Sequence, residues 1–116
     1  MTPFGERVRS LRARNDVSLK QMARDLKVSP AYLSALEHGR RGPPTPELIQ
    51  RICGYFNIIW DEAEDLERCA RLSHPRIRID TAGLSPRATE LANRLSQRIG
   101  ELDEDQLEKM LRELGA

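Results

Sequence analysis

The sequence predicts an all-α protein. Apolar residues recur at helical spacing through most of the chain, beginning with Phe4, Val8 and Leu11. Ser or Thr followed by Pro opens three segments, at residues 29–30, 45–46 and 85–86. This pair favours a helix start, because a proline at the first helical position gives up no hydrogen bond. Aromatic residues make up only 4% of the chain, a composition typical of small helices with narrow apolar stripes.

A length of 116 residues suits one domain, or a small domain with an extension. The helix-breaking pair His74-Pro75 divides the chain, so we expect a domain over residues 1–73 and an extension over residues 74–116. No run of about 18 apolar residues is present, so no membrane span is predicted. The N-terminus lacks the apolar core of a signal peptide. A cytoplasmic protein is therefore expected.

Within the first domain the pattern predicts five helices. They cover residues 3–14, a pair within residues 18–39, residues 46–56, and a stretch from Asp61 to about Leu72. Asp61 and Glu64 are expected to cap the fifth helix. Trp60, the only tryptophan, is expected to anchor the packing of the fourth helix against the fifth rather than to stack on a ligand.

The pair within residues 18–39 is the most informative part of the chain. Ser18 caps its first helix, Lys27 and Val28 form a tight turn, and Gly39 ends its second helix. If Leu33 and Leu36 are buried, the outward face of the second helix carries short side chains and no acid. The major groove of DNA admits such a helix. Two helices joined by a short turn are nevertheless common, so the spacing alone is a weak indication.

The residues here resemble a known family. The following segments match the helix-turn-helix of phage repressor and Cro-like (Xre-type) regulators: Met22-Ala23, Val28-Ser29, Leu33-Ser34 and Leu36-Glu37-x-Gly39, with Phe4-Gly5-x-x-Val8-x-x-Leu11-Arg12 before them and Pro44, Leu48 and Ile52 after them. The resemblance covers about residues 3–60. It implies a five-helix, repressor-like domain that binds specific DNA sequences as a homodimer, with the recognition helix 29–38 in the major groove. It also implies an ion pair between Arg12 and Glu37.

DNA contacts are expected from two sets of residues. Base edges would meet Ser29, Pro30, Ala31, Tyr32, Ser34 and Ala35. Phosphates would meet Ser18, Lys20, His38, Arg40 and Arg41, although for His38 an ordinary surface position is an equal alternative. The family often has glutamine where Leu19 stands and amide side chains where this face has proline and alanine. Readout should therefore depend on thymine methyl groups, Ser34, Tyr32 and DNA shape.

Charge is distributed unevenly along the chain. Residues 1–60 carry ten Lys or Arg and five acids, a net charge of +5, whereas residues 61–116 carry nine basic and thirteen acidic residues, a net charge of −4. Because phosphate contacts supply much of DNA affinity, this asymmetry places the predicted nucleic-acid surface in the N-terminal half.

No chemistry other than binding is indicated. Cys53 and Cys69 are 16 residues apart with no Cys-x-x-Cys motif, so we expect reduced, buried thiols and no metal. Cys69 and His74 could be half of a metal site, but no second pair has ligand spacing. No nucleophile motif, carboxylate pair or glycine-rich phosphate loop is present. We therefore predict no enzyme activity and no cofactor.

The extension has two parts. Residues 76–80 alternate with a period of two, which predicts an isolated strand that pairs with its copy in another subunit or lies extended over the core. A helical hairpin follows, with starts at Ser85 and Asp103 and a stop at Gly100. Its apolar side chains are expected to form a dimer interface rather than to pack on the fifth helix. This interface comprises Ile77, Ile79, Leu91, Leu95, Ile99, Leu107, Met110, Leu111 and Leu114.

The sequence therefore predicts a regulator of transcription, most simply a repressor, whose partners are double-stranded DNA and a second copy of the chain. Two alternatives stay open. One is an antitoxin-type protein that neutralises a partner protein and regulates its own gene by binding DNA. The other is a protein-interaction module that has kept the fold and lost DNA binding.

Overall fold

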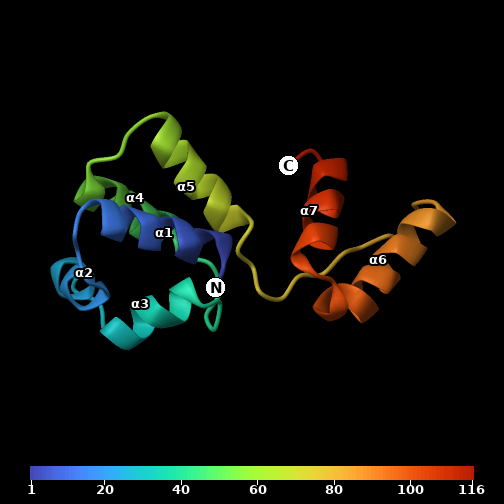
Figure 1. Ribbon diagram of the computed structural model, residues 1–116, viewed down its shortest axis with the longest axis horizontal. Coiled ribbons are helices and arrows are strands. Elements are labelled where there is room, and N and C mark those ends of the chain that lie inside the picture. The colour runs from blue at the N-terminus through green and yellow to red at the C-terminus, as the bar shows by residue number, and fades with distance from the viewer. The chain divides into compact units, whose positions relative to one another are not determined.

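The computed structural model describes all 116 residues, and these divide into two compact units, residues 1–77 and 78–116. Every regular element is helical, so the predicted all-α class is confirmed (Figure 1). The elements are α1 (Pro3–Arg14), α2 (Leu19–Leu26), α3 (Pro30–Glu37), α4 (Pro46–Phe56), α5 (Asp61–Arg71), α6 (Pro86–Arg98), a 3₁₀ turn (Ile99–Glu101) and α7 (Glu104–Glu113). The five helices predicted for the first domain are all present.

Residues 76–80, where alternation predicts a strand, form none within a single chain, and pairing with a copy in another subunit stays a prediction. The segment runs without regular structure, and Ile77 and Ile79 are 72% and 56% exposed. Ile77, the last residue of the first unit, is therefore not packed on the core of that unit, as the other predicted arrangement would require. Alternation alone does not make a strand, since a strand also needs a neighbouring strand to satisfy its backbone groups. The chain offers no such neighbour.

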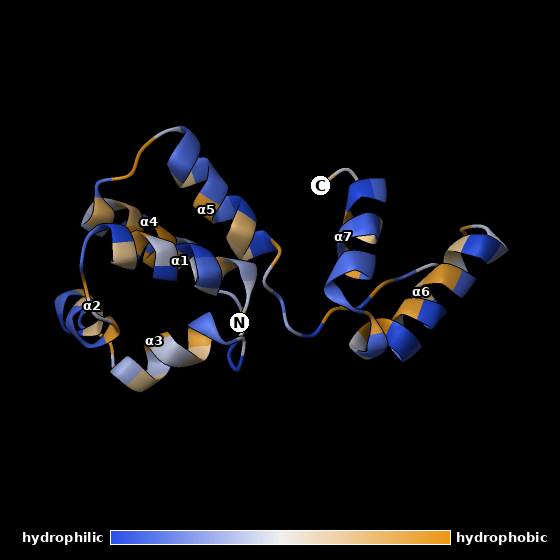
Figure 2. Ribbon diagram, viewed as in Figure 1, coloured by the Kyte–Doolittle hydropathy of each residue, from blue (hydrophilic) through white to orange (hydrophobic).

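The core of the first unit is built from one apolar face of each of its helices (Figure 2). Phe4, Met22, Leu33, Ile52 and Leu66, one from each helix in turn, are fully enclosed. Burying a side chain of this size contributes about 1.5–3 kcal/mol, so these five residues account for much of the stability of a small domain. The faces expected from helical spacing, Phe4, Val8 and Leu11 on α1 and Leu33 and Leu36 on α3, are buried.

Side-chain caps set the starts of four of these helices. Thr2, Ser18, Ser29 and Thr45 accept hydrogen bonds from the backbone amides of Gly5, Gln21, Tyr32 and Leu48. Each hydroxyl satisfies one of the amides that a helix start leaves without a partner. The starts predicted at Ser18, Ser29 and Thr45 are therefore reproduced closely, and Thr2 supplies a fourth cap.

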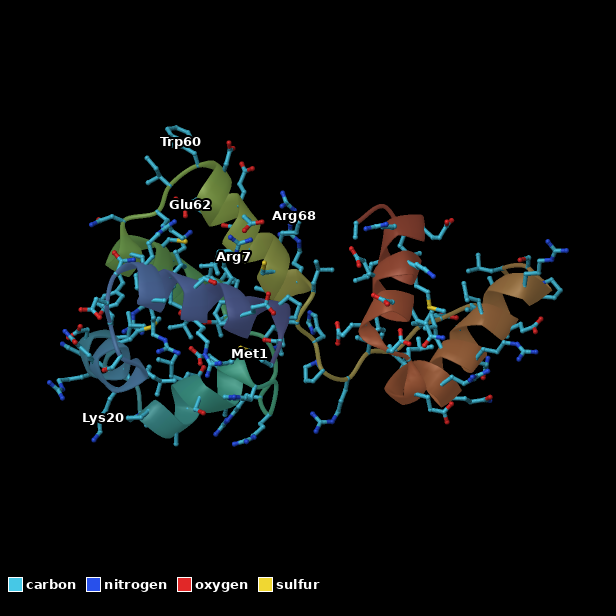
Figure 3. The ribbon with its side chains drawn as sticks, in the orientation of Figure 1. Met1, Arg7, Lys20, Trp60, Glu62 and Arg68 are labelled. Carbon is cyan, nitrogen blue, oxygen red and sulfur yellow. The ribbon has the colours of Figure 1, made fainter.

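The start of α5 differs from the prediction. Asp61 is its first helical residue and not its cap, and no side chain caps the helix. Trp60 is 79% exposed and has a φ of 53°, so it does not anchor α4 against α5 (Figure 3). Asn57 also has a positive φ, and between these two sharp bends only Ile58 is turned into the core. The anchoring role expected of Trp60 therefore belongs to Ile58.

Polar contacts join helices that are distant in sequence. Arg7 pairs with Asp65 at 2.5 Å, and Arg14 with Glu62 at 2.9 Å, both between α1 and α5 (Figure 3). The Ser73 hydroxyl, just beyond α5, accepts from the Phe4 amide at 2.9 Å. Because the first amides of α1 have no partner within the helix, this bond fixes the start of α1 against the end of α5.

The second unit contains α6, the 3₁₀ turn and α7. Ser85 caps α6, and Asp103 and Gln106 form the predicted capping box of α7. Gly100 was expected to stop α6, but α6 ends at Arg98 and Gly100 lies within the 3₁₀ turn that follows. No residue of α6 or α7 is buried. In neither unit is there a helix with the length and apolar character that crossing a bilayer requires.

The backbone of α1 comes very close to the end of α3 at Gly5. A Cβ atom there would overlap the backbone of Glu37, including its carbonyl oxygen. Only a residue without a side chain therefore lets α1 cross the end of α3 at this distance.

We expect Gly5→Ala to lower the free energy of unfolding by about 3 kcal/mol, the upper range for overpacking, because two backbones would have to separate. Gly54→Ala is the matched control. Gly54 lies in α4, and a Cβ atom there would meet no other atom within 4 Å, so alanine should raise the stability by about 0.5–1 kcal/mol through helix propensity. Urea denaturation measures both. Equal effects of the two substitutions would contradict the close approach.

The Tyr55 hydroxyl donates to Asp25 at 2.5 Å and so links α4 to α2. Burial and then this carboxylate raise the pKa of Tyr55 from 10.0 to about 12. Between these two values the folded state holds a proton that the unfolded state releases, so the stability should fall as pH rises from 10 to 12. Denaturant titrations across this range should show a smaller fall for Tyr55→Phe. An unchanged pH dependence in that variant would refute the assignment.

Candidate nucleic-acid interface

The turn between α2 and α3 is set by three adjacent residues. Lys27 adopts the left-handed conformation, with a φ of 59°, and ends α2. Val28 packs partly buried against the core, and its amide donates to the Ala23 carbonyl at 2.9 Å. Ser29 then caps α3, and Pro30 occupies the first position of the helix. The turn therefore has the form that the sequence predicted.

The solvent face of α3 contains all six residues predicted to read bases. Ser29, Pro30 and Ala31 are exposed, whereas Tyr32, Ser34 and Ala35 are partly exposed. The Ser29 oxygen accepts from the Tyr32 amide at 3.0 Å, which leaves its hydroxyl proton free to be donated. The single acid of α3, Glu37, is fully buried. The exposed side chains of this face are thus uncharged and, apart from Tyr32, short.

The residues predicted to contact phosphate lie at the two ends of this helix pair. Ser18 caps α2 by accepting from the Gln21 amide at 3.0 Å, and Lys20 extends from the first turn into solvent (Figure 3). The helix start also presents backbone amides, which favour an anion. At the other end His38, Arg40 and Arg41 follow α3 and are all exposed.

Two of these residues are held by contacts that the sequence did not reveal. His38 Nδ1 lies 2.9 Å from the Ser34 carbonyl oxygen, which directs the other ring nitrogen outward. The Arg41 guanidinium lies over the Tyr32 ring, 5.6 Å from its centre. Cation–π contacts of this kind contribute about 0.5–1 kcal/mol at exposed sites. A predicted phosphate contact and a predicted base contact are therefore coupled before any ligand arrives.

The end of α3 is fixed to α1 through Glu37. Arg12 Nη2 donates to both carboxylate oxygens of Glu37, at 3.1 and 3.2 Å, and only 12% of the Arg12 side chain is exposed. The Glu37 carbonyl oxygen accepts from the Thr2 amide at 3.0 Å. The side chain and the backbone of one buried residue therefore both bind the first helix.

The Thr2 contact was missed in the sequence, although a signal for it exists. Thr2-Pro3 is a fourth hydroxyl-and-proline helix start, like the three noted above, and it predicts the cap that holds Thr2 in place. Nothing in the sequence indicates the long-range bond to Glu37, because the cap pattern describes only neighbouring residues.

Other candidate sites give no comparable arrangement. A groove of about 430 Å³ is lined by Pro43, Pro44, Pro46, Ile49, Gln50, Glu67, Ala70, Arg71 and His74, none of which is a predicted DNA contact. No group of three or more His, Cys, Asp or Glu residues could hold a metal ion. Cys53 and Cys69 are free thiols that are partly rather than fully buried, because each sits at the margin of the core. Burial, followed by the nearby Glu67, raises the pKa of Cys53 and so disfavours its reactive thiolate.

Comparison with known proteins supports the resemblance seen in the motifs. A family model described as a helix-turn-helix domain matches residues 3–66. The chain is also similar to two proteins of Bacillus subtilis (strain 168). It is 31% identical to "Uncharacterized HTH-type transcriptional regulator RghRB" and 34% identical to "HTH-type transcriptional repressor RghR", each over 61 residues.

Both alignments cover 53% of this chain, and they cover 44% and 45% of the two relatives. The match therefore spans less than half the length of either relative. No solved structure matches the chain significantly.

The buried pair Arg12–Glu37 generates a stability prediction. Arg12→Met should cost about 3–5 kcal/mol, because it leaves an uncompensated carboxylate in the core. Replacing both residues, as Arg12→Met with Glu37→Met, should cost less than the sum of the single changes.

The control is Arg14→Met. Arg14 pairs with Glu62 and so joins α1 to α5, but unlike Arg12 and Glu37 both residues of this pair are more than half exposed. Its loss should cost less than about 1 kcal/mol. Thermal or urea denaturation of the variants measures the differences, and an equal cost at Arg12 and Arg14 would contradict the role of burial.

Proposed function

The chain belongs to the helix-turn-helix domain family, and from that premise we propose that it is a sequence-specific transcriptional regulator that acts as a repressor. It binds double-stranded DNA as a homodimer and inserts α3 into the major groove. The repressor role is supported by the name of one relative, "HTH-type transcriptional repressor RghR".

The observation that carries the proposal is the exposed face of α3. Its side chains from Ser29 to Ala35 are short or aromatic, and the acid that would repel DNA is turned into the core. Short side chains let a helix backbone come close to base edges, as a recognition helix in the major groove must. The anchorage of Glu37 to α1 supports a fixed orientation of this face.

Phosphate binding follows from the ends of the helix pair. Lys20 and the amides at the start of α2 would contact one strand, and Arg40 and Arg41 would contact the backbone beside the end of α3. Contacts of this kind set the register of a protein on DNA but carry no sequence information directly. Their affinity falls with salt, because each neutralised phosphate releases counterions.

Base readout would use a limited set of groups. The methyl groups of Ala31 and Ala35 fit against the thymine methyl, and the hydroxyls of Ser29, Ser34 and Tyr32 can bond to base edges. Since no long amide or arginine side chain projects from this face, the remaining selectivity would come from DNA shape.

A homodimer supplies the second half-site. Helix-turn-helix dimers bind half-sites about one turn of DNA apart, so a symmetric site requires two copies held together. The exposed apolar side chains of residues 77–114 support association through the second unit.

The direct test is selection of bound fragments from random duplex DNA at about 0.15 M salt. We expect a two-fold symmetric consensus that is not rich in guanine. Recovery of DNA fragments with no sequence preference, lost as salt rises, would indicate electrostatic binding without recognition of bases and would overturn the proposal. The antitoxin-type and protein-interaction alternatives would then be the better explanations.

A pair of charge-matched variants tests the placement of α3. Ala31→Glu should weaken binding to the selected site by about 100-fold or more, because a carboxylate in the groove faces the negative charge of DNA. Ala31 is exposed near the start of α3, where an acid suits the helix dipole, so the fold should be kept. Ala82→Glu adds the same charge at an exposed position outside all helices and should change affinity little. Gel-shift titration measures both.

A further inference from the structure

The second unit leaves both of its helices without a packing partner. α6 and α7 each carry apolar side chains on one face, and no residue of either helix is buried (Figure 2). Leu91 on α6, Leu111 on α7 and Leu114 just beyond α7 are all more than half exposed. A unit of 39 residues with no buried side chain has no core of its own to stabilise it. The apolar faces of α6 and α7 therefore require another protein surface to pack against.

The two helices do not cover one another. They diverge from the 3₁₀ turn at Ile99–Glu101, and Figure 1 shows them separating along their length. Antiparallel helices that share a core normally lie side by side in a bundle. Here Leu95, Leu102 and Leu107, next to the turn, and the small residues Ala88 and Ala92 of α6 are partly covered, and no residue of the unit is buried.

The charges of the two helices are opposite. α6 carries three arginines and one acid, a net charge of +2, whereas α7 carries four acids and two bases, a net charge of −2. Arg87, Arg94 and Arg98 recur at i, i+7 and i+11 and so follow one edge of the α6 stripe. Glu104 and Glu108, four residues apart, follow an edge of the α7 stripe. Within one chain three of these charges have exposed partners farther from the stripe, namely Arg94 with Glu90, Arg98 with Glu101 and Glu108 with Arg112. The charged positions nearest each stripe are thus basic on α6 and acidic on α7.

Building on the proposed homodimer, we propose that α6 of one protomer packs against α7 of its partner, and α7 against the partner's α6. The two exchanged pairs form a four-helix arrangement with two-fold symmetry. This arrangement places each basic edge beside an acidic edge. Pairing α6 with α6, or α7 with α7, would place like charges along the same contact, which is unfavourable.

Two charge-reversal variants of the full chain test the exchange. The first carries Arg87→Glu and Arg94→Glu in α6, and the second carries Glu104→Lys and Glu108→Lys in α7. Each variant alone creates like-charged contacts at both pairs of the dimer, so its dimer dissociation constant should rise by about tenfold or more. Arg76→Glu with Arg78→Glu is the control, because it reverses two arginines outside the helices and should leave the constant within about twofold.

Mixing the two variants is the decisive step. In a mixed dimer the acidic α6 meets the basic α7, and the unaltered α6 meets the unaltered α7, so both exchanged pairs are restored. Native mass spectrometry, which separates the three dimers by mass, should show the mixed dimer in excess over either self-dimer. Circular dichroism of each variant checks that helix content is retained.

Three outcomes would overturn the exchange. If both variants dimerise as well as the unmodified chain, charge does not select the pairing. If the α6 variant prefers the unmodified chain and the α7 variant behaves like the control, α6 pairs with α6. If one chain carrying all four reversals dimerises normally but the mixture does not favour the mixed dimer, α6 pairs with α7 of its own chain. In each case symmetric DNA selection by the unmodified chain would leave the proposed function intact, whereas a chain that dimerises by exchange but selects no DNA would overturn the function alone.

Discussion

The geometry of the first unit depends on one buried residue, Glu37. Its carboxylate binds Arg12 and its carbonyl binds Thr2, so the end of α3 is attached twice to α1. Gly5 makes this possible, because any side chain there would overlap Glu37. A helix of eight residues is unstable on its own. The direction in which α3 points is therefore set by these contacts rather than by the helix itself.

Around the helix pair α2–α3, single polar residues also serve two purposes. Ser29 both starts α3 and leaves a hydroxyl proton at its exposed end, while His38 both ends α3 and presents a ring nitrogen. The Arg41 guanidinium lies over the Tyr32 ring. Groups already held in place lose less conformational entropy when they bind a ligand. Under the proposed function, this prior ordering lets a surface with few long side chains bind DNA in one orientation.

The two units differ in whether their apolar side chains are buried. The first folds five helices around a shared core, whereas the second keeps its apolar stripes exposed and borders them with opposite charges on α6 and α7. The uneven charge along the chain follows this division, with the basic excess in the unit that contains the helix-turn-helix. Positive charge in the first unit favours binding to DNA, and under the proposed exchange the opposite charges of α6 and α7 select the helix of the partner.

The sequence by itself determined the features that depend on residues close together in the chain, namely helix starts, turns and helix faces. Hydroxyl-and-proline starts and helical spacing set α1, α4 and the turn at Lys27, and the same spacing identified the solvent face of α3. Only the tertiary structure decided what depends on distant residues. Trp60 is exposed because two bends turn Ile58 inward in its place, residues 76–80 have no neighbouring strand, and Thr2 reaches Glu37 across 35 residues. Caps and spacing act within one or two helical turns, whereas burial and cross-helix bonds arise only when the helices pack.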